Sequence, residues 1–383
     1  MVSCFLFLVF GCLLYSNVRK TKLARQNLSI DRNLVILILL FVFVGLIAVA
    51  DASAPQAISR YGDKFFFFKQ QLIWAGVGIA ALFATSKINY KFWEKVATPF
   101  FLLSVILLTL VLLPHLGFKA LGARRWIDAG FFSFQPSELI KLSLAMFLAK
   151  VASKNKNAIS YFLPVLLVVG LIMLQPDLGT TLVVATIGLG QIFVSGIKLL
   201  YFAGALLTGF LGTIGLILIS PYRKERLLTF LQMERDPLGS SYHIRQVLLG
   251  LGSGGLFGVG LGASRQKYLF LPEASTDSIF AVIAEELGLL GAISIIILFG
   301  LFIYKGLTIA KNAPDVFSRV LATGITIWIG GQAFLNIASM VALVPLTGIP
   351  LPFISYGGSS LVMILVACGI LLNISKYSTI HSR

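Results

Sequence analysis

Ten long apolar runs, each close to the length of a membrane-spanning helix, constrain this chain more than any other feature. They lie at roughly 34–50, 71–86, 97–114, 139–152, 160–174, 179–196, 199–219, 279–304, 318–344 and 359–375. A helical span needs about 20 apolar residues, and these runs lack the alternation of β-barrel strands. With 57% hydrophobic residues, the chain also falls outside the soluble class. The sequence predicts an all-α polytopic membrane protein with about ten transmembrane helices.

The positions of the basic residues predict the orientation of these helices. If the segment before residue 34 is cytoplasmic, 17 of the 31 Lys and Arg residues fall in cytoplasmic loops and termini. The short outward loops then hold only six. Positive residues are retained on the cytoplasmic side during insertion, so both termini are predicted to lie inside. The net charge of +16 is then explained by this bias and by anionic membrane lipids, and no nucleic-acid partner is expected.

The runs define one membrane domain, 34–377, between an N-terminal cytoplasmic segment, 1–33, and a cytoplasmic tail, 378–383. The apolar stretch 2–16 is short for a span, which leaves a partial helix, a signal-like segment or a misplaced start codon as alternatives. A large extracellular loop, 221–276, separates the seventh and eighth helices. Its first half has the pattern of an interfacial amphipathic helix. Its second half is rich in glycine, which suits either close approach to a ligand or simple turns.

Two shorter outward loops carry further signals. The loop 115–135 contains Arg124 and Arg125 next to Trp126, a combination that suits the lipid headgroup zone because guanidinium groups bind phosphate. A purely interfacial anchor explains it equally well. The loop 343–360 has three prolines followed by Gly-Gly-Ser-Ser. Irregular backbone of this kind is tolerated near a membrane where it lines a cavity, so we expect a stiff wall there.

Ionisable residues in or beside the spans are costly, at about 2.5–3.5 kcal/mol each on insertion scales, and suggest function by default. Glu138 and Lys141 are three residues apart on one face of the fourth predicted helix. They form either part of a site or a self-neutralising pair. Asp177, between the fifth and sixth helices, is a second candidate, although capping a helix would explain it fully.

Asp277 is the strongest candidate, because it begins the eighth predicted helix directly after the large loop, at the level of the headgroups. It too could simply cap its helix. Glu285 and Glu286 follow about 12 Å deeper along the helix axis. Both are rotated away from Asp277 at 100° per residue, so we interpret them as buried groups that hold helices together.

Four stretches resemble, in order along 31–377, the SEDS membrane proteins, the group of FtsW, RodA and SpoVE. They are RRWIDAGFFSFQPSELIKL, QPDLGTT, GLFGVGLGASRQKYLFLPEASTDSIFAVIAEELGLLG and PLTGIPLPFISYGGSS. Within the group, YGDKFFFFKQQLIW and the Gly-Gly-Ser-Ser ending look closer to FtsW. Two residues depart from the usual pattern: Ser275 stands where many members have His, and Ser278 where many have Phe.

The resemblance implies a ten-helix peptidoglycan glycosyltransferase that polymerises lipid II at the outer face of the bacterial cytoplasmic membrane, for septal wall synthesis in cell division. It implies that Asp277 is the essential acid, that Glu138 and Lys141 are a polar pair beside it, and that Asp177 is another functional aspartate. It also implies a class B penicillin-binding protein and other division proteins as partners.

The reaction itself indicates what the site needs. A sugar hydroxyl attacks an anomeric carbon while a lipid pyrophosphate departs, so a base and cations matter more than a general acid. We hypothesise that Asp277 is the base, that Lys141 keeps it ionised and that Glu138 balances the lysine. No cofactor is required by the sequence, and a divalent metal ion on Asp277 is an open alternative. The candidate pyrophosphate ligands are Arg124, Arg125, Arg223, Arg226, Arg265 and Lys267.

Three other functions stay open at this point. A lipid II flippase would also need ten helices and intramembrane charges, although the polar residues gather near the outer side and no inverted repeat is evident. A RodA-type polymerase would serve cell elongation instead of division. A scaffold for other division proteins would need no chemistry at Asp277.

Overall fold

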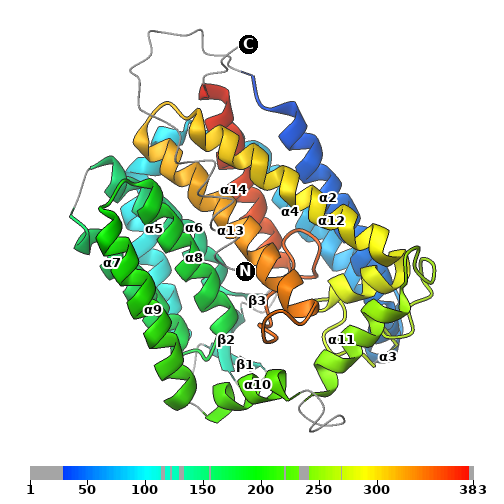
Figure 1. The fold of residues 1–383 in the computed structure, drawn as a ribbon. Coiled ribbons are helices and arrows are strands. Elements are labelled where there is room, and N and C mark those ends of the chain that lie inside the picture. The colour runs from blue at the N-terminus through cyan, green and yellow to red at the C-terminus, as the bar shows by residue number, and fades with distance from the viewer. Residues whose placement is uncertain are drawn as a thin grey trace.

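The computed structural model describes residues 29–113, 117–120, 123–128, 133–154, 157–219, 221–232, 241–268 and 270–378. These residues form a helical bundle with one small sheet (Figure 1). The start of α2 (Arg32–Ala52) and the end of α14 (Gly358–Tyr377) lie at one end of the bundle. The short helix α10 (Pro221–Leu231) and the sheet lie at the other, which we call the loop end.

Each of the ten predicted runs coincides with a helix. Besides α2 and α14 these are α4 (Phe66–Lys87), α5 (Tyr90–Leu110), α6 (Pro136–Ser153), α7 (Ile159–Met173), α8 (Leu178–Val194), α9 (Leu199–Ile219), α12 (Ile279–Lys311) and α13 (Val316–Met340). Within the described ranges, six helices are long and apolar enough to cross a membrane, namely α2, α4, α5, α12, α13 and α14. The multi-pass membrane architecture is confirmed, while a count of ten spans stays a prediction.

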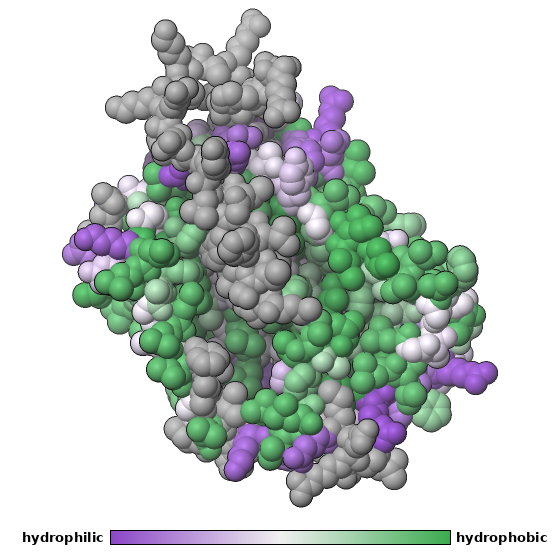
Figure 2. All heavy atoms as spheres, in the orientation of Figure 1, coloured by the Kyte–Doolittle hydropathy of each residue, from purple (hydrophilic) through white to green (hydrophobic). Residues whose placement is uncertain are grey.

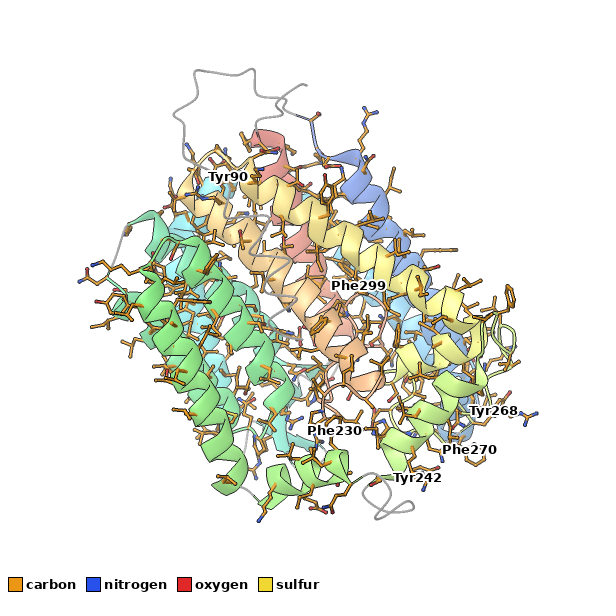
Figure 3. All side chains as sticks on the ribbon, viewed as in Figure 1. Tyr90, Phe230, Tyr242, Tyr268, Phe270 and Phe299 are labelled. Carbon is orange, nitrogen blue, oxygen red and sulfur yellow. The ribbon has the colours of Figure 1, made fainter. Side chains whose placement is uncertain are left out.

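The surface has the pattern expected of a membrane protein. Hydrophobic side chains cover the flanks, and hydrophilic ones gather toward the two ends (Figure 2). Large apolar side chains such as Ile36, Ile73 and Leu166 are about two-thirds exposed, which is costly in water but favourable against lipid. Aromatic residues lie toward both ends, with Tyr90 opposite Tyr242 (Figure 3), as in the interfacial belts of membrane proteins.

The core is built around α13, which is buried over 89% of its most apolar stretch. It packs against α6, α8 and α12. Elsewhere small residues allow close helix contact, as expected in a membrane where packing drives association. A Cβ atom on Gly369 of α14 would lie 2.4 Å from the Leu82 carbonyl oxygen of α4, and one on Gly78 of α4 would lie 2.5 Å from Leu365. Gly369 thus lets the two backbones approach, and Gly78 makes room for the Leu365 side chain.

The loop end holds the remaining elements: α3 (Ala54–Tyr61), β1 (Gly117–Ala120), β2 (Ala123–Asp128), β3 (Ser133–Phe134), α10 and α11 (Tyr242–Ser253). The strands form an antiparallel sheet in the order β1-β2-β3. The sequence predicts no strands in this loop, because its arginines and aromatic residues are interpreted there by their chemistry, as phosphate-binding groups or as an interfacial anchor. Helix α10 confirms the amphipathic helix expected after residue 221. The apolar stretch 2–16 lies outside the described residues.

Helix α12 is broken where the glycine-rich second half of the large loop, residues 250–274, meets it. We call this half the glycine-rich segment. Gly288 has non-helical angles, φ 66° and ψ −166°, which interrupt the i to i−4 hydrogen bonds. The loop supplies replacements: the N–H groups of Val259 and Gly260 donate to the carbonyls of Glu285 and Glu286, at 3.0 and 3.1 Å. In the opposite direction, the N–H groups of residues 289 and 290 donate to the carbonyls of residues 255 and 256 in the loop. The glycine-rich segment is therefore a fixed partner of α12.

Candidate active site

The segment that carries Asp277 is held by main-chain hydrogen bonds from distant elements. Three successive carbonyls accept hydrogen bonds: Ser275 from the Tyr356 N–H (2.9 Å), Thr276 from the Ser355 hydroxyl (2.5 Å) and Asp277 from the Asn336 amide (2.8 Å). Buried backbone groups are nearly always paired, and here the pairing comes from α13 and the loop before α14. The backbone of the segment is thereby fixed without use of the Asp277 side chain.

The Asp277 carboxylate has no partner among the residues that the structure describes. Within the described residues it accepts no hydrogen bond and forms no ion pair. Gly348, with φ at +68°, brings its backbone so close that a Cβ atom there would lie 3.4 Å from the Asp277 Oδ2 atom. The Asp277 side chain is therefore partly enclosed, with an intermediate exposure.

Burial raises the pKa of Asp277 to about 7, because desolvation disfavours the charged form. The negative charges of Glu273 and Asp177 raise this pKa further, and the positive charges of Arg226 and Arg125 oppose them. A carboxyl group whose pKa lies near the working pH is suited to accept a proton. Strongly shifted groups of this kind are concentrated at functional sites.

Asp177 lies at the start of α8, where its carboxylate accepts a hydrogen bond from the Thr180 N–H at 2.9 Å. The capping alternative is therefore what the geometry shows. The Arg125 guanidinium lies 3.7 Å from the other carboxylate oxygen and also donates to the carbonyls of residues 175 and 176. Strand β2 is thus joined to the start of α8. Since the charges of both side chains also act on Asp277, Asp177 contributes to the site as well as to its helix.

Glu138 and Lys141 form a buried ion pair on α6, with 2.8 Å between Oε1 and Nζ. The Lys141 ammonium also donates to the Gln332 side-chain oxygen at 2.9 Å and lies 5.2 Å from the centre of the Trp328 ring. In the described parts of the chain, neither member of the pair makes a hydrogen bond or ion pair with Asp277. Any influence of the pair on that acid must act through other residues.

Helix α13 provides that indirect route. Gln332, which binds the lysine of the pair, donates from its amide to the Pro350 carbonyl at 2.9 Å. One turn later, Asn336 donates to both Ile349 and Asp277 carbonyls, at 2.7 and 2.8 Å. Two amides four residues apart therefore join the ion pair, the proline-rich loop and the acid. The charge-based sequence analysis missed both amides, because uncharged side chains on an apolar helix give little signal.

The candidate arginine ligands differ in their relation to Asp277. Arg125 and Arg226 act electrostatically on Asp277, and Arg226 also donates to the Leu346 carbonyl at 3.2 Å. Arg124 is half-buried on β2 beside them. Arg265 is exposed on the glycine-rich segment, and the side chain of Arg223 lies outside the described set.

Lys267 has a different environment from the arginines. Only 5% of its surface is exposed, and its ammonium lies 2.6 Å from an Asp51 oxygen and 2.7 Å from a Glu286 oxygen. Its positive charge is thus occupied within the protein, and its role as a pyrophosphate ligand stays a prediction. Asp51, at the end of α2, was missed by the sequence analysis, although a carboxylate ending an apolar helix meets the same intramembrane-charge criterion.

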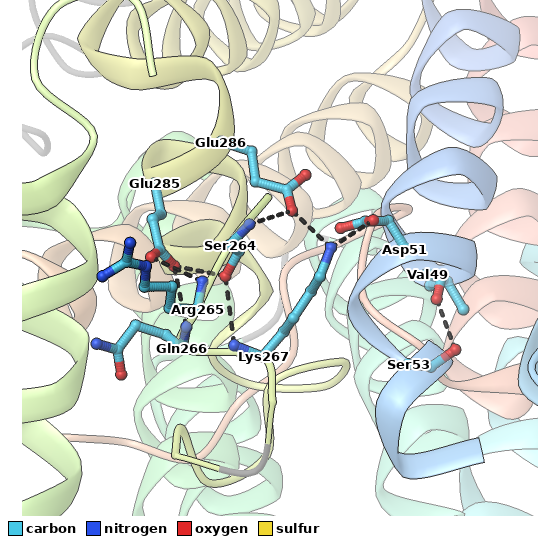
Figure 4. Close-up of polar contacts among 9 residues, drawn as sticks. All are labelled: Val49, Asp51, Ser53, Ser264, Arg265, Gln266, Lys267, Glu285 and Glu286. Carbon is cyan, nitrogen blue, oxygen red and sulfur yellow. Dashed lines mark hydrogen bonds and ion pairs between the residues drawn. The ribbon is translucent and has the colours of Figure 1, made fainter. Parts of the chain in front are cut away.

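Glu285 and Glu286 hold the segment before Lys267 in place (Figure 4). Glu285 accepts from the Ser264 hydroxyl (2.5 Å) and from the N–H groups of Arg265 and Gln266 (3.1 and 3.4 Å). Glu286 accepts from the Ser264 N–H at 3.1 Å in addition to Lys267. The two glutamates therefore join α12 to the glycine-rich segment and, through Lys267, to α2. This is the structural role that their spacing from Asp277 predicts.

Comparison with known proteins places the chain in a family. The model for the FtsW, RodA and SpoVE proteins, described as "Cell cycle protein", matches residues 31–380. This chain belongs to that family. It is 45% identical over 361 residues to stage V sporulation protein E of Bacillus subtilis, covering 92% of this chain and 99% of that protein. It is 40% identical over 358 residues to the probable peptidoglycan glycosyltransferase FtsW of Coxiella burnetii, covering 91% and 96%.

Solved structures share the fold. The chain superimposes with a TM-score of 0.76 on a chain from a structure described as the coordination of polymerization and crosslinking by a peptidoglycan synthase complex, at 29% identity and with 90% and 97% of the two chains covered. The RodA rod-shape-determining protein of Thermus thermophilus gives a TM-score of 0.68 at 30% identity, covering 90% and 96%. The arrangement of helices is therefore that of this family throughout the bundle.

Proposed function

We propose that this protein is a peptidoglycan glycosyltransferase that polymerises lipid II into glycan strands at the outer face of the cytoplasmic membrane. One observation carries the proposal: an unpaired, partly enclosed carboxylate, Asp277, with a pKa raised to about 7 and two arginines in its field. The function in the names of its FtsW relatives supports the same assignment.

In the proposed reaction, Asp277 is the base and the arginines stabilise the leaving group. A sugar hydroxyl of one substrate attacks the anomeric carbon of another, the new glycosidic C–O bond forms, and the C–O bond to the pyrophosphate breaks. The Asp277 carboxylate accepts the proton of the attacking hydroxyl. The departing pyrophosphate keeps the electron pair, and Arg125 and Arg226 stabilise its negative charge. Arg124, Arg223 and Arg265 are further candidate ligands on the loop-end elements.

A divalent metal ion on Asp277 is a separate question. In the parts of the chain that the structure describes, no group of three or more His, Cys, Asp or Glu side chains is arranged to hold a metal ion. A metal ion at Asp277 would therefore have fewer than three of the described acidic, His and Cys side chains as ligands. Chelation followed by readdition of Mg²⁺ or Mn²⁺ in a polymerisation assay tests whether the reaction needs a divalent ion.

The orientation and partners are also part of the proposal. We place the loop end outside the cell and both termini in the cytoplasm, because basic residues favour the opposite end. We assign septal wall synthesis together with a class B penicillin-binding protein that crosslinks the new strands. A solved relative that coordinates polymerization with crosslinking supports such a pairing. Imaging a tagged copy through the division cycle distinguishes a septal role from a RodA-like role along the side wall.

Reconstitution tests the activity directly. Purified protein in vesicles, with its penicillin-binding partner, is supplied with labelled lipid II on the accessible face. The polymerase is supported if wild-type protein makes glycan strands and Asp277→Asn protein does not. Translocation of lipid II without polymer would instead identify a flippase. A scaffold would be identified by two results together. The folded Asp277→Asn variant would give a normal polymer yield, and cells would still need the protein to divide.

A further inference from the structure

The Ser278 hydroxyl does not do what its position predicts. Ser278 precedes the first residue of α12, where a serine normally accepts a hydrogen bond from a backbone N–H of the first turn. It makes no such cap. Its Oγ atom instead lies 3.1 Å from the Pro272 carbonyl oxygen and 2.8 Å from His243 Nε2 on α11. This fully buried hydroxyl is therefore committed to tertiary contacts.

The direction of these hydrogen bonds follows from the number of hydrogens. A serine hydroxyl has one hydrogen to donate, and the Pro272 carbonyl can only accept it. With that hydrogen on Pro272, the contact with His243 runs the other way in the tautomer that carries its proton on Nε2, and the ring Nε2–H donates to Ser278. Burial lowers the pKa of His243, with the positive charge of Arg226 acting in the same direction and Glu273 opposing both. The ring is thus neutral at physiological pH, with its proton assigned to Nε2 from the network.

The relay closes a turn around the catalytic candidate. It runs from His243 on α11 through Ser278 to Pro272, and its Ser278–Pro272 contact joins the two ends of the segment 272–278 that contains Asp277. Other residues hold the carbonyls of this segment from α13 and the loop before α14, as described above. Among the described residues, the relay ties the end of this segment to α11. It also gives a use to Ser278, where many relatives resembling this chain have an apolar Phe.

We propose that His243 is a positioning residue for Asp277, which acts through Ser278 to fix the turn that presents the carboxylate to the substrate. The inference rests on the proposed function, because it concerns the placement of the same base. A base displaced by a fraction of an ångström loses rate in the chemical step more than in binding. The expected signature is therefore a lower kcat with little change in KM.

Four variants test this relay in the reconstituted polymerisation assay with labelled lipid II. We expect His243→Ala and Ser278→Ala each to lower kcat about tenfold, a loss typical of a misplaced catalytic group, while KM changes less than about twofold. His243→Gln retains an N–H donor of similar reach and should recover kcat to within about threefold. Because both residues act in one relay, the double variant should be no slower than either single one. Arg245→Ala, an exposed change on the same helix, is the control and should leave kcat unchanged.

The outcomes separate this inference from the proposed function. If His243→Ala and Ser278→Ala leave kcat unchanged while Asp277→Asn abolishes polymer, the relay is wrong and the base stands. If the two losses multiply in the double variant, or Gln fails to restore kcat, the residues do not act as a relay and the inference is also wrong. If Asp277→Asn polymerises normally, the proposed function fails first. If His243→Ala does not fold, the kcat values of Ser278→Ala and His243→Gln test whether the relay positions Asp277.

Discussion

The segment just before α12 and the second turn of α12 use carboxylates in opposite ways. In that segment, Asp277 has its backbone fixed by distant elements, while its carboxylate has no partner among the described residues. Two turns further on, Glu285 and Glu286 accept hydrogen bonds from Ser264 to Lys267 and complete an ion-pair network with α2. A buried charge is costly unless it is paired, so the unpaired acid is the one that the fold maintains at an energetic cost. That cost is the physical sign of function.

The largest expected effect separates the two kinds of acid by activity. Asp277→Asn should lower the polymerisation rate about 100-fold to 10,000-fold, the range expected for loss of a general base. Glu285→Gln keeps the shape and one acceptor oxygen, so the polymerisation rate of its folded protein should stay within about threefold of the wild-type rate. Rates are normalised to folded protein measured by size-exclusion chromatography. Equal losses in the two folded variants would remove the distinction.

Thermal stability should depend more on the paired carboxylates of the Lys267 network than on the unpaired Asp277. Lys267→Met leaves the Asp51 and Glu286 carboxylates without their shared cation, and removal of one member of a buried ion pair costs about 3–5 kcal/mol. Thermal unfolding in detergent should show a large drop in Tm. The control is Lys69→Met, which breaks a solvent-exposed pair with Asp63 and should leave Tm unchanged, because surface pairs contribute little. A small effect of Lys267→Met would mean that the network does not support α12.

The pH dependence of the rate sharpens the comparison, because only the unpaired acid should titrate near neutrality. With a pKa of about 7, Asp277 is protonated and inactive as a base below that pH. The rate should rise about tenfold per pH unit up to pH 7 and level off above it. Initial rates between pH 5.5 and 8.5, with binding of the substrate measured in parallel, test this. A profile already flat at pH 5.5 would contradict the raised pKa.

The smallest effect concerns the cost of keeping Asp277 unpaired. Its folded pKa lies above the ordinary value, so ionisation favours the unfolded state progressively from about pH 4 to pH 7, and the penalty is complete above pH 7. Asp277→Asn removes the penalty and should raise Tm at pH 8, by about 2–4 °C if roughly 1 kcal/mol is recovered. The gain should vanish near pH 4. A lower Tm at pH 8 would show that the carboxylate stabilises the fold.

Much of the architecture was predictable because a bilayer imposes local rules. Backbone groups in lipid must be satisfied within each segment, so every apolar run became a helix, with boundaries near those expected from the sequence. The broken α12 and the small sheet were not predicted. Gly288 leaves the helix only because the glycine-rich segment supplies replacement hydrogen bonds, and no local pattern marks such a partner.

For the site, the sequence by itself determined which residues were unusual: few acids in an apolar chain, with Asp277 at the start of a helix after a large loop. It could not determine which of them were paired. Pairing depends on elements that are distant in sequence, as when Asp51 meets Lys267 or Asn336 binds the carbonyl of Asp277. The tertiary structure alone decided that Glu286 pairs with Lys267 and that Glu285 accepts hydrogen bonds from Ser264, Arg265 and Gln266. It likewise decided that the Asp277 carboxylate has no partner among the described residues, because polar groups around it such as Asn336 bind its backbone instead.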